Sequence, residues 1–471
     1  MNEPSVSTEK MPKPADEKAP ASDGSHITNP TPEVNGVGSH DSSDRDPEKN
    51  SNGHTPLKFP SPAPAPASCM PIAPNGGFLA WLQVAGSFCI FLNTWGVVNM
   101  YGVFQTYYTD SLQGSSSSAI SWIGSVQVFL LSLIGTLVGP IYDGGNVRLL
   151  LIVGLVTSVF GIFMTSLCNR YWQFFLAQGL VTGFGFGCLF LPGVAIVSQY
   201  FTTKKAFATG IASLGSSIGG VVYPILWTQL QPKVGFGWAT RVIGFIMLGT
   251  LLLPLVALRP LQYPKTRRSL FDLSSLRDVP YVLFGLGTFF GYMGIYVVFF
   301  YIELYATSRA NVSAYMGFYL LALINAGSSL GRVLPNFAAD YVGTLNMQTS
   351  FAFFAAILSL VLLAIRNTQG IVAFCVLYGF FTGTFVSLPA PTVASLTPNL
   401  ALLGGRMSMA FMAAGLGSLI GSPIAGAILA TNGGENWVGL QIWAGALLVL
   451  STAAMIGART AKVGYKIYAK A

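Results

Sequence analysis

The chain has 471 residues, of which 52% are hydrophobic and only 9% are charged. Charged residues make up about 25% of a typical soluble domain, so this composition excludes a soluble globular protein and indicates one that crosses a membrane many times. The net charge of +8 is the positive bias of loops beside a membrane, and we expect no nucleic-acid partner. All three histidines precede residue 75 and the five cysteines show no paired spacing, so we expect neither a metal site nor a cofactor.

The first 75 residues differ from the rest of the chain. They are rich in Pro, Ser and charged residues and hold ten of the 17 acids. Such a composition cannot bury a core, so residues 1–75 are predicted to form a disordered cytoplasmic tail. The tail is not a signal peptide, because no basic start is followed promptly by an apolar stretch.

From Phe78 onward, apolar runs long enough to span a bilayer follow one another with short polar breaks. We expect an all-α membrane protein with twelve transmembrane helices. The predicted spans are 78–102, 118–142, 147–168, 171–197, 206–229, 240–258, 280–304, 314–339, 344–365, 370–395, 405–429 and 437–457. The long polar break 259–279 then divides two six-helix halves, 76–258 and 280–458, and residues 459–471 form a C-terminal tail.

The basic residues predict the orientation. With the N-terminal tail inside, most Lys and Arg residues of the body fall on the inner side. The outer connections hold only Arg170, Lys233, Arg241, Arg309 and Arg366. This bias places both termini in the cytoplasm, and we expect a functional monomer in the plasma membrane.

The two halves resemble each other at an offset near 200 residues. QGLVTGFGFGCLFLPG (178–193) parallels YGFFTGTFVSLPAP (378–391), and Gly215 parallels Gly415. Chance coincidence is the alternative in a chain with 53 glycines. Tandem six-helix repeats are typical of secondary transporters, which bind substrate near the midplane between the halves.

Arg332 lies deep in the eighth span, where no other charge occurs before Asp340. A cation at the centre of a membrane helix costs about 2.5–3.5 kcal/mol on insertion scales, which favours a functional role. The alternative is snorkelling, because the predicted membrane edge is only about two turns away.

GPIYDGGNVR (139–148) lies at the inner end of the second span. It resembles the signature of the major facilitator superfamily between helices two and three. Asp143 can face the positive end of a neighbouring helix and Arg148, forming a cytoplasmic gate, with Asp340 as its counterpart in the second half. A solvated turn residue is the alternative for Asp143.

Two further motifs narrow the resemblance. NGGFLAW (75–81) and YFTTKKAFATGIASLGSSIG (200–219) are similar to signatures of the monocarboxylate transporter family, and GGVVYPI is closest to its fungal branch. Lys204 and Lys205 anchor the fifth helix at the lipid headgroups, whereas Gly210 and Gly215 let helices approach closely. Static packing explains these glycines as well as motion does.

Departures from that family concern proton coupling. Proton-coupled animal members of the family that this chain resembles have a Lys in the first helix and an Asp one turn before the eighth-helix Arg. This chain has Asn99 in place of that Lys and Ser328 in place of that Asp. We still expect Arg332 to bind a carboxylate, because a guanidinium holds a carboxylate through two parallel hydrogen bonds. Proton coupling is left open. Glu303 and Asp110 are acids near the outer side that either take up a proton or are simply solvated.

These patterns predict a transporter that works by alternating access and moves a small organic anion or related metabolite. Arg332, Asn99, Tyr296 and Asn325 are the expected substrate-binding residues, with interhelical hydrogen bonding as the alternative for the amides. The competing function is carriage of a bulkier aromatic or neutral compound, by riboflavin-like uptake or by efflux of a secondary metabolite. A non-transporting nutrient sensor is a further alternative, and the body contains no constellation typical of an enzyme.

Overall fold

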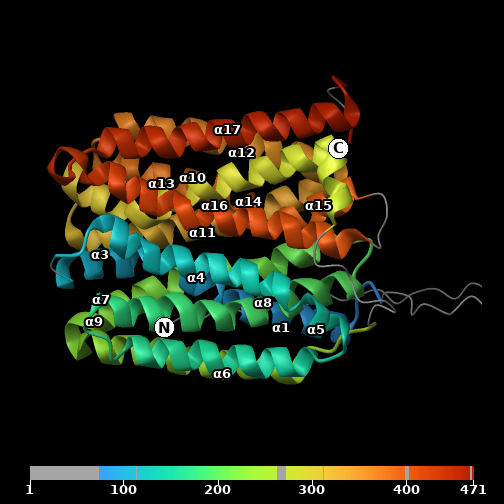
Figure 1. The fold of residues 1–471 in the computed structure, drawn as a ribbon, viewed down its shortest axis with the longest axis horizontal. Helices are drawn as coiled ribbons and strands as arrows, with labels where there is room; N and C mark the ends of the chain where they lie inside the picture. The colour runs from blue at the N-terminus through green and yellow to red at the C-terminus, as the bar shows by residue number, and fades with distance from the viewer. Residues whose placement is uncertain are drawn as a thin grey trace, which may run out of the picture. The chain divides into compact units, whose positions relative to one another are not determined.

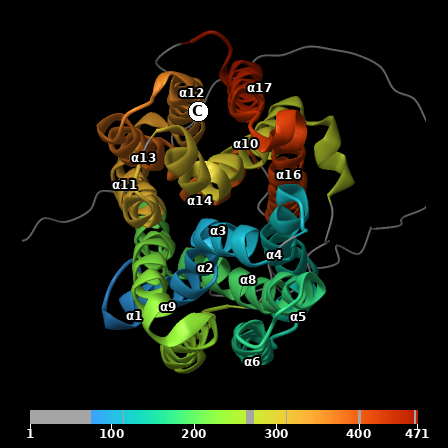
Figure 2. The same cartoon turned by 90° about the vertical axis from the view of Figure 1, so that its left-hand side faces the viewer.

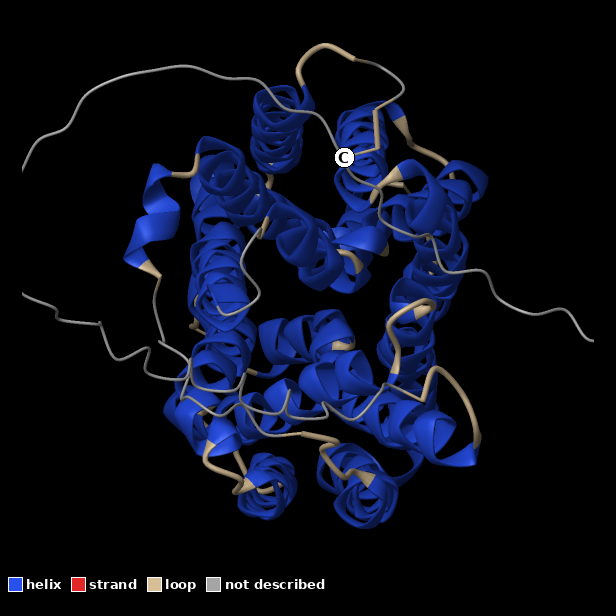
Figure 3. Ribbon diagram, turned by 90° about the vertical axis from the view of Figure 1, so that its right-hand side faces the viewer, coloured by secondary structure: helices blue, strands red, loops and turns tan. Residues whose placement is uncertain are grey.

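The computed structural model describes residues 74–112, 114–262, 272–310, 312–397, 402–466 and 469–470. Within these residues the chain consists of helices and connecting loops, with no strand (Figure 3). The predicted disordered tail lies outside the described residues, apart from its last two positions.

Six spans are built from the first half of the chain. Their elements are α1 (Phe78–Asn93), α2 (Trp95–Asn99), α3 (Tyr101–Ser111), α4 (Ser117–Leu137), α5 (Gly139–Asp143), α6 (Val147–Thr165), α7 (Tyr171–Phe174), the π-helical η1 (Phe175–Thr182), α8 (Gly183–Tyr200) and α9 (Lys205–Ala257). The first span is longer than predicted, because α1, α2 and α3 continue one another with interruptions at Thr94 and Met100.

The second half supplies six more spans. Its elements are η2 (Leu273–Arg277), α10 (Val279–Arg309), α11 (Ala314–Val342), α12 (Thr344–Val361), η3 (Leu362–Ala364), α13 (Thr368–Thr382), α14 (Thr384–Ser387), α15 (Pro389–Leu396), α16 (Leu403–Ala430), η5 (Thr431–Gly434) and α17 (Trp437–Val463). Side chains of Ser116, Ser313, Asn367 and Asn436 cap the N-termini of α4, α11, α13 and α17, which is why those helices begin where they do.

The span count agrees with the sequence. Ten helical stretches of the described chain are long and apolar enough to cross a membrane. One of them, α9, has 53 residues and is broken at Gly235, whose φ of 77° is not helical, so it makes two crossings. The 29-residue helix α11 adds the twelfth, since about 1.5 Å per residue carries it across a hydrocarbon core of about 30 Å. The predicted twelve-helix fold is confirmed.

The helices gather into the two halves. Figure 2 shows α1 to α9 on one side and α10 to α17 on the other, and Figure 1 shows the long helices side by side. We call the end where α1 begins the tail end, and the opposite end, where α3 ends, the distal end. Two helix pairs make the most extensive contacts between the halves, α4 with α16 and α9 with α11. Moving each helix six spans along the chain converts one pair into the other, because α4 corresponds to α11 and α9 to α16. This is expected for halves related by a pseudo-twofold axis.

The two family-like motifs meet at the tail end. The Oδ1 atom of Asn75 accepts hydrogen bonds from the backbone N–H groups of Thr202 and Thr203, at 2.7 and 3.1 Å. The N–H of Asn75 donates in turn to the carbonyl oxygen of Tyr200 at 3.0 Å. Segments more than 120 residues apart are therefore tied together where the fifth span begins.

The end of the polar break is fixed to the second half by a cluster of Asp272, Asp278, Tyr281 and Arg406, which we call the linker cluster. The Arg406 guanidinium contacts Asp272 at 3.3 Å and Asp278 at 2.6 Å. A hydrogen bond from Ser274, together with Arg406, holds the pKa of the Asp272 carboxyl below its usual value. Residues 263–271, which include Lys265, Arg267 and Arg268, lie outside the described part of the chain.

Candidate substrate-binding site

Arg332 lies in the interior of the bundle and does not snorkel to an edge. Its side chain is only 1% exposed. Nη1 donates a hydrogen bond of 2.8 Å to the backbone carbonyl of Ser213, and Nε donates one of 3.2 Å to the Ser328 hydroxyl. Ser213 belongs to α9 and Arg332 to α11, so the guanidinium joins the two halves.

Arg332 is one of a row of polar residues on a single face of α11. The row contains Asn325, Ser328, Arg332 and Asn336, whose spacing of three or four residues places them one above another on a helix. All four are buried, with at most 1% exposed. Burying so many polar groups is costly unless they find partners, and Asn325 and Arg332 find partners in the first half, Asn99 and Ser213.

The small residues of α9 divide between two neighbours. A side chain at Gly210 would begin 2.9 Å from the backbone oxygen of Arg332, and one at Gly220 would collide with the Asn325 amide. Gly215 and Gly219 instead lie against the backbone of α1, within the same half. Gly210 and Gly220 therefore permit close contact between the halves, whereas Gly215 and Gly219 permit close packing inside one half.

Asn99 and Asn325 form a second polar link between the halves. Nδ2 of Asn99 donates a hydrogen bond of 3.0 Å to Oδ1 of Asn325, and Nδ2 of Asn325 donates to the backbone of its own helix. Both side chains are buried. Interhelical hydrogen bonding, the alternative role that the sequence offers for these amides, is thus present. It crosses the interface between the halves, where a substrate would bind.

A cavity of about 10 Å³ lies beside Arg332 at this interface. Its lining residues come from both halves and are Asn99, Tyr292, Ile295, Tyr296, Phe299, Ser328, Arg332, Thr382, Phe385 and Val386. Three of the four predicted binding residues line it, and the fourth, Asn325, bonds to one of them. The volume is close to the minimum for one water molecule, so the site is contracted in this conformation.

Aromatic rings form one wall of this cavity. The ring centroid of Trp95 lies 6.4 Å from that of Tyr296, with the planes nearly parallel, and 6.3 Å from that of Tyr292. The Tyr292 hydroxyl is fixed by a 2.8 Å hydrogen bond to the backbone oxygen of Phe385. Tyr292, which sequence reasoning missed, lies one helical turn before Tyr296 and shares its face.

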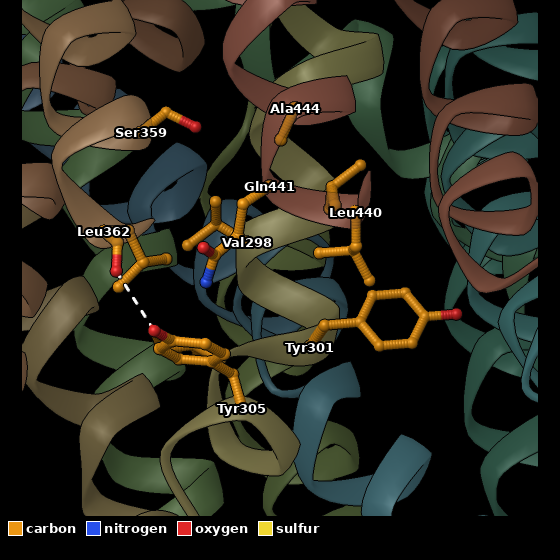
Figure 4. Close-up of a pocket in the computed structure, with 10 residues that line it drawn as sticks. Val298, Tyr301, Tyr305, Ser359, Leu362, Leu440, Gln441 and Ala444 are labelled. Carbon is orange, nitrogen blue, oxygen red and sulfur yellow. Dashed lines mark hydrogen bonds between the residues drawn. The ribbon is translucent and has the colours of Figure 1, made fainter. Parts of the chain in front are cut away.

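A second cavity, also of about 10 Å³, lies among α10, α12 and α17, inside the second half (Figure 4). Tyr305 donates a 3.1 Å hydrogen bond to the Leu362 carbonyl at its edge. Ser359 and Gln441 supply polar groups. Because none of its walls comes from the other half, it does not open when the halves part, and it is not a candidate translocation site.

The predicted gating residues lie at the tail end. Asp143 is buried at the end of α5, and Arg148 is exposed in the first turn of α6, where it lines a cavity of about 350 Å³. Asp340 is half-buried near the end of α11, and its backbone oxygen accepts a 2.6 Å hydrogen bond from Lys470. Their gating role stays a prediction.

The two lysines of the helix-five motif lie at the start of that helix, and their anchoring role stays a prediction. Lys204 is exposed just before α9, and Lys205 begins that helix.

The fold consists of two six-helix halves with a buried cavity between them, and the helix pairs that the repeat exchanges connect the halves. This arrangement defines the class of secondary transporters. Comparison with known proteins identifies the family. The model described as Major Facilitator Superfamily matches residues 86–401, and the chain belongs to this superfamily. It is a multi-pass membrane protein that transports a small organic compound.

Relatives and a solved structure agree with this assignment. The chain is 43% identical to the MFS-type transporter dbaD of Emericella nidulans over 372 residues, which cover 79% of this chain and 84% of that one. It is 36% identical to the aspyridones efflux protein apdF of the same organism over 388 residues, covering 82% and 79%. The crystal structure of a mutant of the nucleoside transporter NupG matches with a TM-score of 0.62 at 15% identity, over 80% of this chain and 99% of that one, which shows a shared fold.

Proposed function

We propose that this transporter exports a small organic anion with an aromatic body, held between the two halves by Arg332. The observation that carries the proposal is the position of the guanidinium. It is a fully buried cation in a cavity at the interface between the halves, beside the stacked rings of Trp95 and Tyr296. A cation and a flat apolar wall together suit a planar molecule with one acidic group.

The contacts of Arg332 suggest how binding alters the interface. An acidic group of the substrate would accept hydrogen bonds from the guanidinium in place of the Ser213 carbonyl and the Ser328 hydroxyl. Because a cavity of about 10 Å³ cannot hold an organic molecule, the halves would part to admit it. Substrate binding would thereby loosen the contact between α9 and α11, as alternating access requires.

Export is favoured over uptake by the relatives. One of them is named as the efflux protein for aspyridones. We place this chain in the monocarboxylate-transporter-like, fungal branch on the strength of its helix-five motif, including Lys204 and Lys205, and of the contact that joins that motif to Asn75. We further propose a plasma-membrane monomer with cytoplasmic termini.

The proton-coupling pair of the animal members of that family is absent from this chain. Asn99 and Ser328 stand at its two positions, and neither side chain exchanges a proton at physiological pH. Any coupling to protons must therefore use another group.

A metabolite comparison between a deletion strain and its parent tests export. We expect at least one aromatic acid to accumulate inside the deletion strain and to fall in its medium. Vesicles holding the purified protein should then accumulate that compound against its gradient. If the protein binds the compound but vesicles do not accumulate it, the protein is a sensor and the proposal is wrong.

A further inference from the structure

Glu303 is a buried acid that the proposed transport site does not use. It lies in α10 near the distal end, six residues before Arg309, and only 2% of it is exposed. Among the described residues, its Oε2 atom has no hydrogen-bond partner. Burying an acid within a membrane helix is costly, so such a residue is by default a candidate functional group.

Among the residues that the structure describes, no compensating cation lies near Glu303. From α3, Thr106 lies beside the carboxyl group, and Asp110 is the charged residue near enough to act on it. From α11, Gly317 packs against it, with its ideal Cβ position 3.5 Å from Cγ of Glu303. Arg309, on the same helix, contacts Glu435 at 3.3 Å and is partly exposed. Within the described part of the chain, the charge that acts on Glu303 is thus another acid, which repels a carboxylate.

Charged side chains on the other packed helices are far away. Arg332 on α11 follows Gly317 by 15 residues, or about 22 Å along a helix. On α16 and α17 the charged residues Arg406, Arg459 and Lys462 lie toward the tail end. An ionised carboxylate without a partner is strongly disfavoured in such a place, whereas a protonated acid is accommodated.

Glu303 also lies between the halves, where they close the distal end. Its neighbours Thr106 and Asp110 belong to the first half. Around it, an ideal Cβ on Gly102 lies 2.6 Å from the backbone oxygen of Phe299, and Gln229 donates a 2.7 Å hydrogen bond to the Tyr319 hydroxyl. These contacts must break if the halves part at this end, and water then reaches the carboxyl group.

We propose that Glu303 is a proton-operated latch of the distal gate, with its carboxyl group protonated while the halves touch and ionised when they part. On opening, the carboxyl proton passes to water at the distal end, and on closing one proton is taken back from the same solution. Acid on the distal side therefore favours closure. The proposal needs the halves to separate at that end, but it is independent of the substrate and of Arg332.

Two spin labels measure the gate without any substrate. Lys233→Cys in the first half and Asn432→Cys in the second are both exposed at the distal end. With the native cysteines replaced and the protein in nanodiscs, the distance between the labels reports opening. We expect the ratio of open to closed molecules to rise with pH, by up to about tenfold per pH unit for one proton.

Variants then show whether Glu303 is the group whose titration opens the gate. Glu303→Gln resembles the protonated acid and should hold the gate closed at every pH, while Glu303→Asp should keep a titration and controls for folding. Asp110→Asn removes the repelling neighbour and should move the midpoint to lower pH. Glu435→Gln, an exposed acid at the same end, should leave it unchanged. A pH-independent wild type, or the same titration in Glu303→Gln as in the wild type, overturns the proposal.

Discussion

Substitution of Arg332 tests the proposed anchor directly. In Arg332→Ala the cavity loses its cation, whereas Arg332→Lys keeps the charge but loses the planar pair of donors. The fold should tolerate both changes, because the Ser213 carbonyl lies within α9 and keeps the hydrogen bond that a helix interior provides. Loss of transport can then be separated from loss of folding.

The magnitude follows from the hydrogen bonds that the guanidinium now makes. It donates two, to Ser213 and Ser328, and it would donate two to an acidic group of the substrate. A hydrogen bond to a charged group contributes about 1.5–3 kcal/mol, so losing two costs at least about 3 kcal/mol, or about 150-fold in affinity. Arg332→Lys loses about one such bond, which corresponds to about tenfold.

The assay is export of the identified substrate from cells, together with its binding to the purified protein. Arg366→Ala is the matched control, because Arg366 is an exposed arginine at the distal end. It should transport like the wild type. The reasoning fails if Arg332→Ala reaches the membrane in normal amount and binds the substrate with unchanged affinity.

Three further predictions concern the linker cluster, the helix contacts and the aromatic wall. Asp272→Asn should lower thermal stability in detergent near neutral pH. Because the native pKa of Asp272 is lowered, the stability that its carboxylate contributes is fully present above its unfolded pKa of about 3.9. The difference from wild type should therefore shrink as the pH falls below about 3.9 and through the lower, folded pKa. Gly215→Ala places a methyl group against a backbone carbonyl of α1 and should lower the free energy of unfolding by about 1–3 kcal/mol. Gly249→Ala, with open space around it, should leave that free energy unchanged. Equal melting temperatures of the two variants would contradict the packing argument. Tyr296→Ala should weaken binding of an aromatic substrate by about tenfold, whereas Tyr296→Phe keeps the stacked ring and should keep most of the affinity. Similar affinities of the two variants would argue against an aromatic substrate.

The span boundaries show where sequence reasoning is weakest. Hydropathy predicts that the first span ends at residue 102, but its helix continues to Ser111. The extra turns contain polar residues that resemble a loop in sequence. In the structure, Gln105 donates a 3.0 Å hydrogen bond to Ser121, and the hydroxyl of Thr109 bonds back to its own helix at 2.8 Å. Polar groups paired in this way can lie within a bundle, and hydropathy does not register the pairing.

The candidate site is only partly visible in the sequence. Arg332 stands out because an isolated charge in an apolar run is costly wherever the helix packs. Its partner on α9 does not stand out, because the Ser213 contact is made by a backbone carbonyl, which every residue has. Tyr292 escapes notice for a related reason: the seventh span has aromatic residues on all sides, and only packing decides which rings face the cavity.

The sequence by itself determined the membrane fold and the number of spans, and it singled out Arg332 as an isolated charge in an apolar run. These depend on the hydropathy of each segment and on the cost of one charge, which are local properties. Tertiary structure alone decided that Arg332 and Asn99 lie at one cavity, that Gly210 faces the other half whereas Gly215 faces its own, and that Glu303 is enclosed between the halves. Each of these depends on the rotation of one helix against another, and that rotation is set by the packing of side chains from distant parts of the chain.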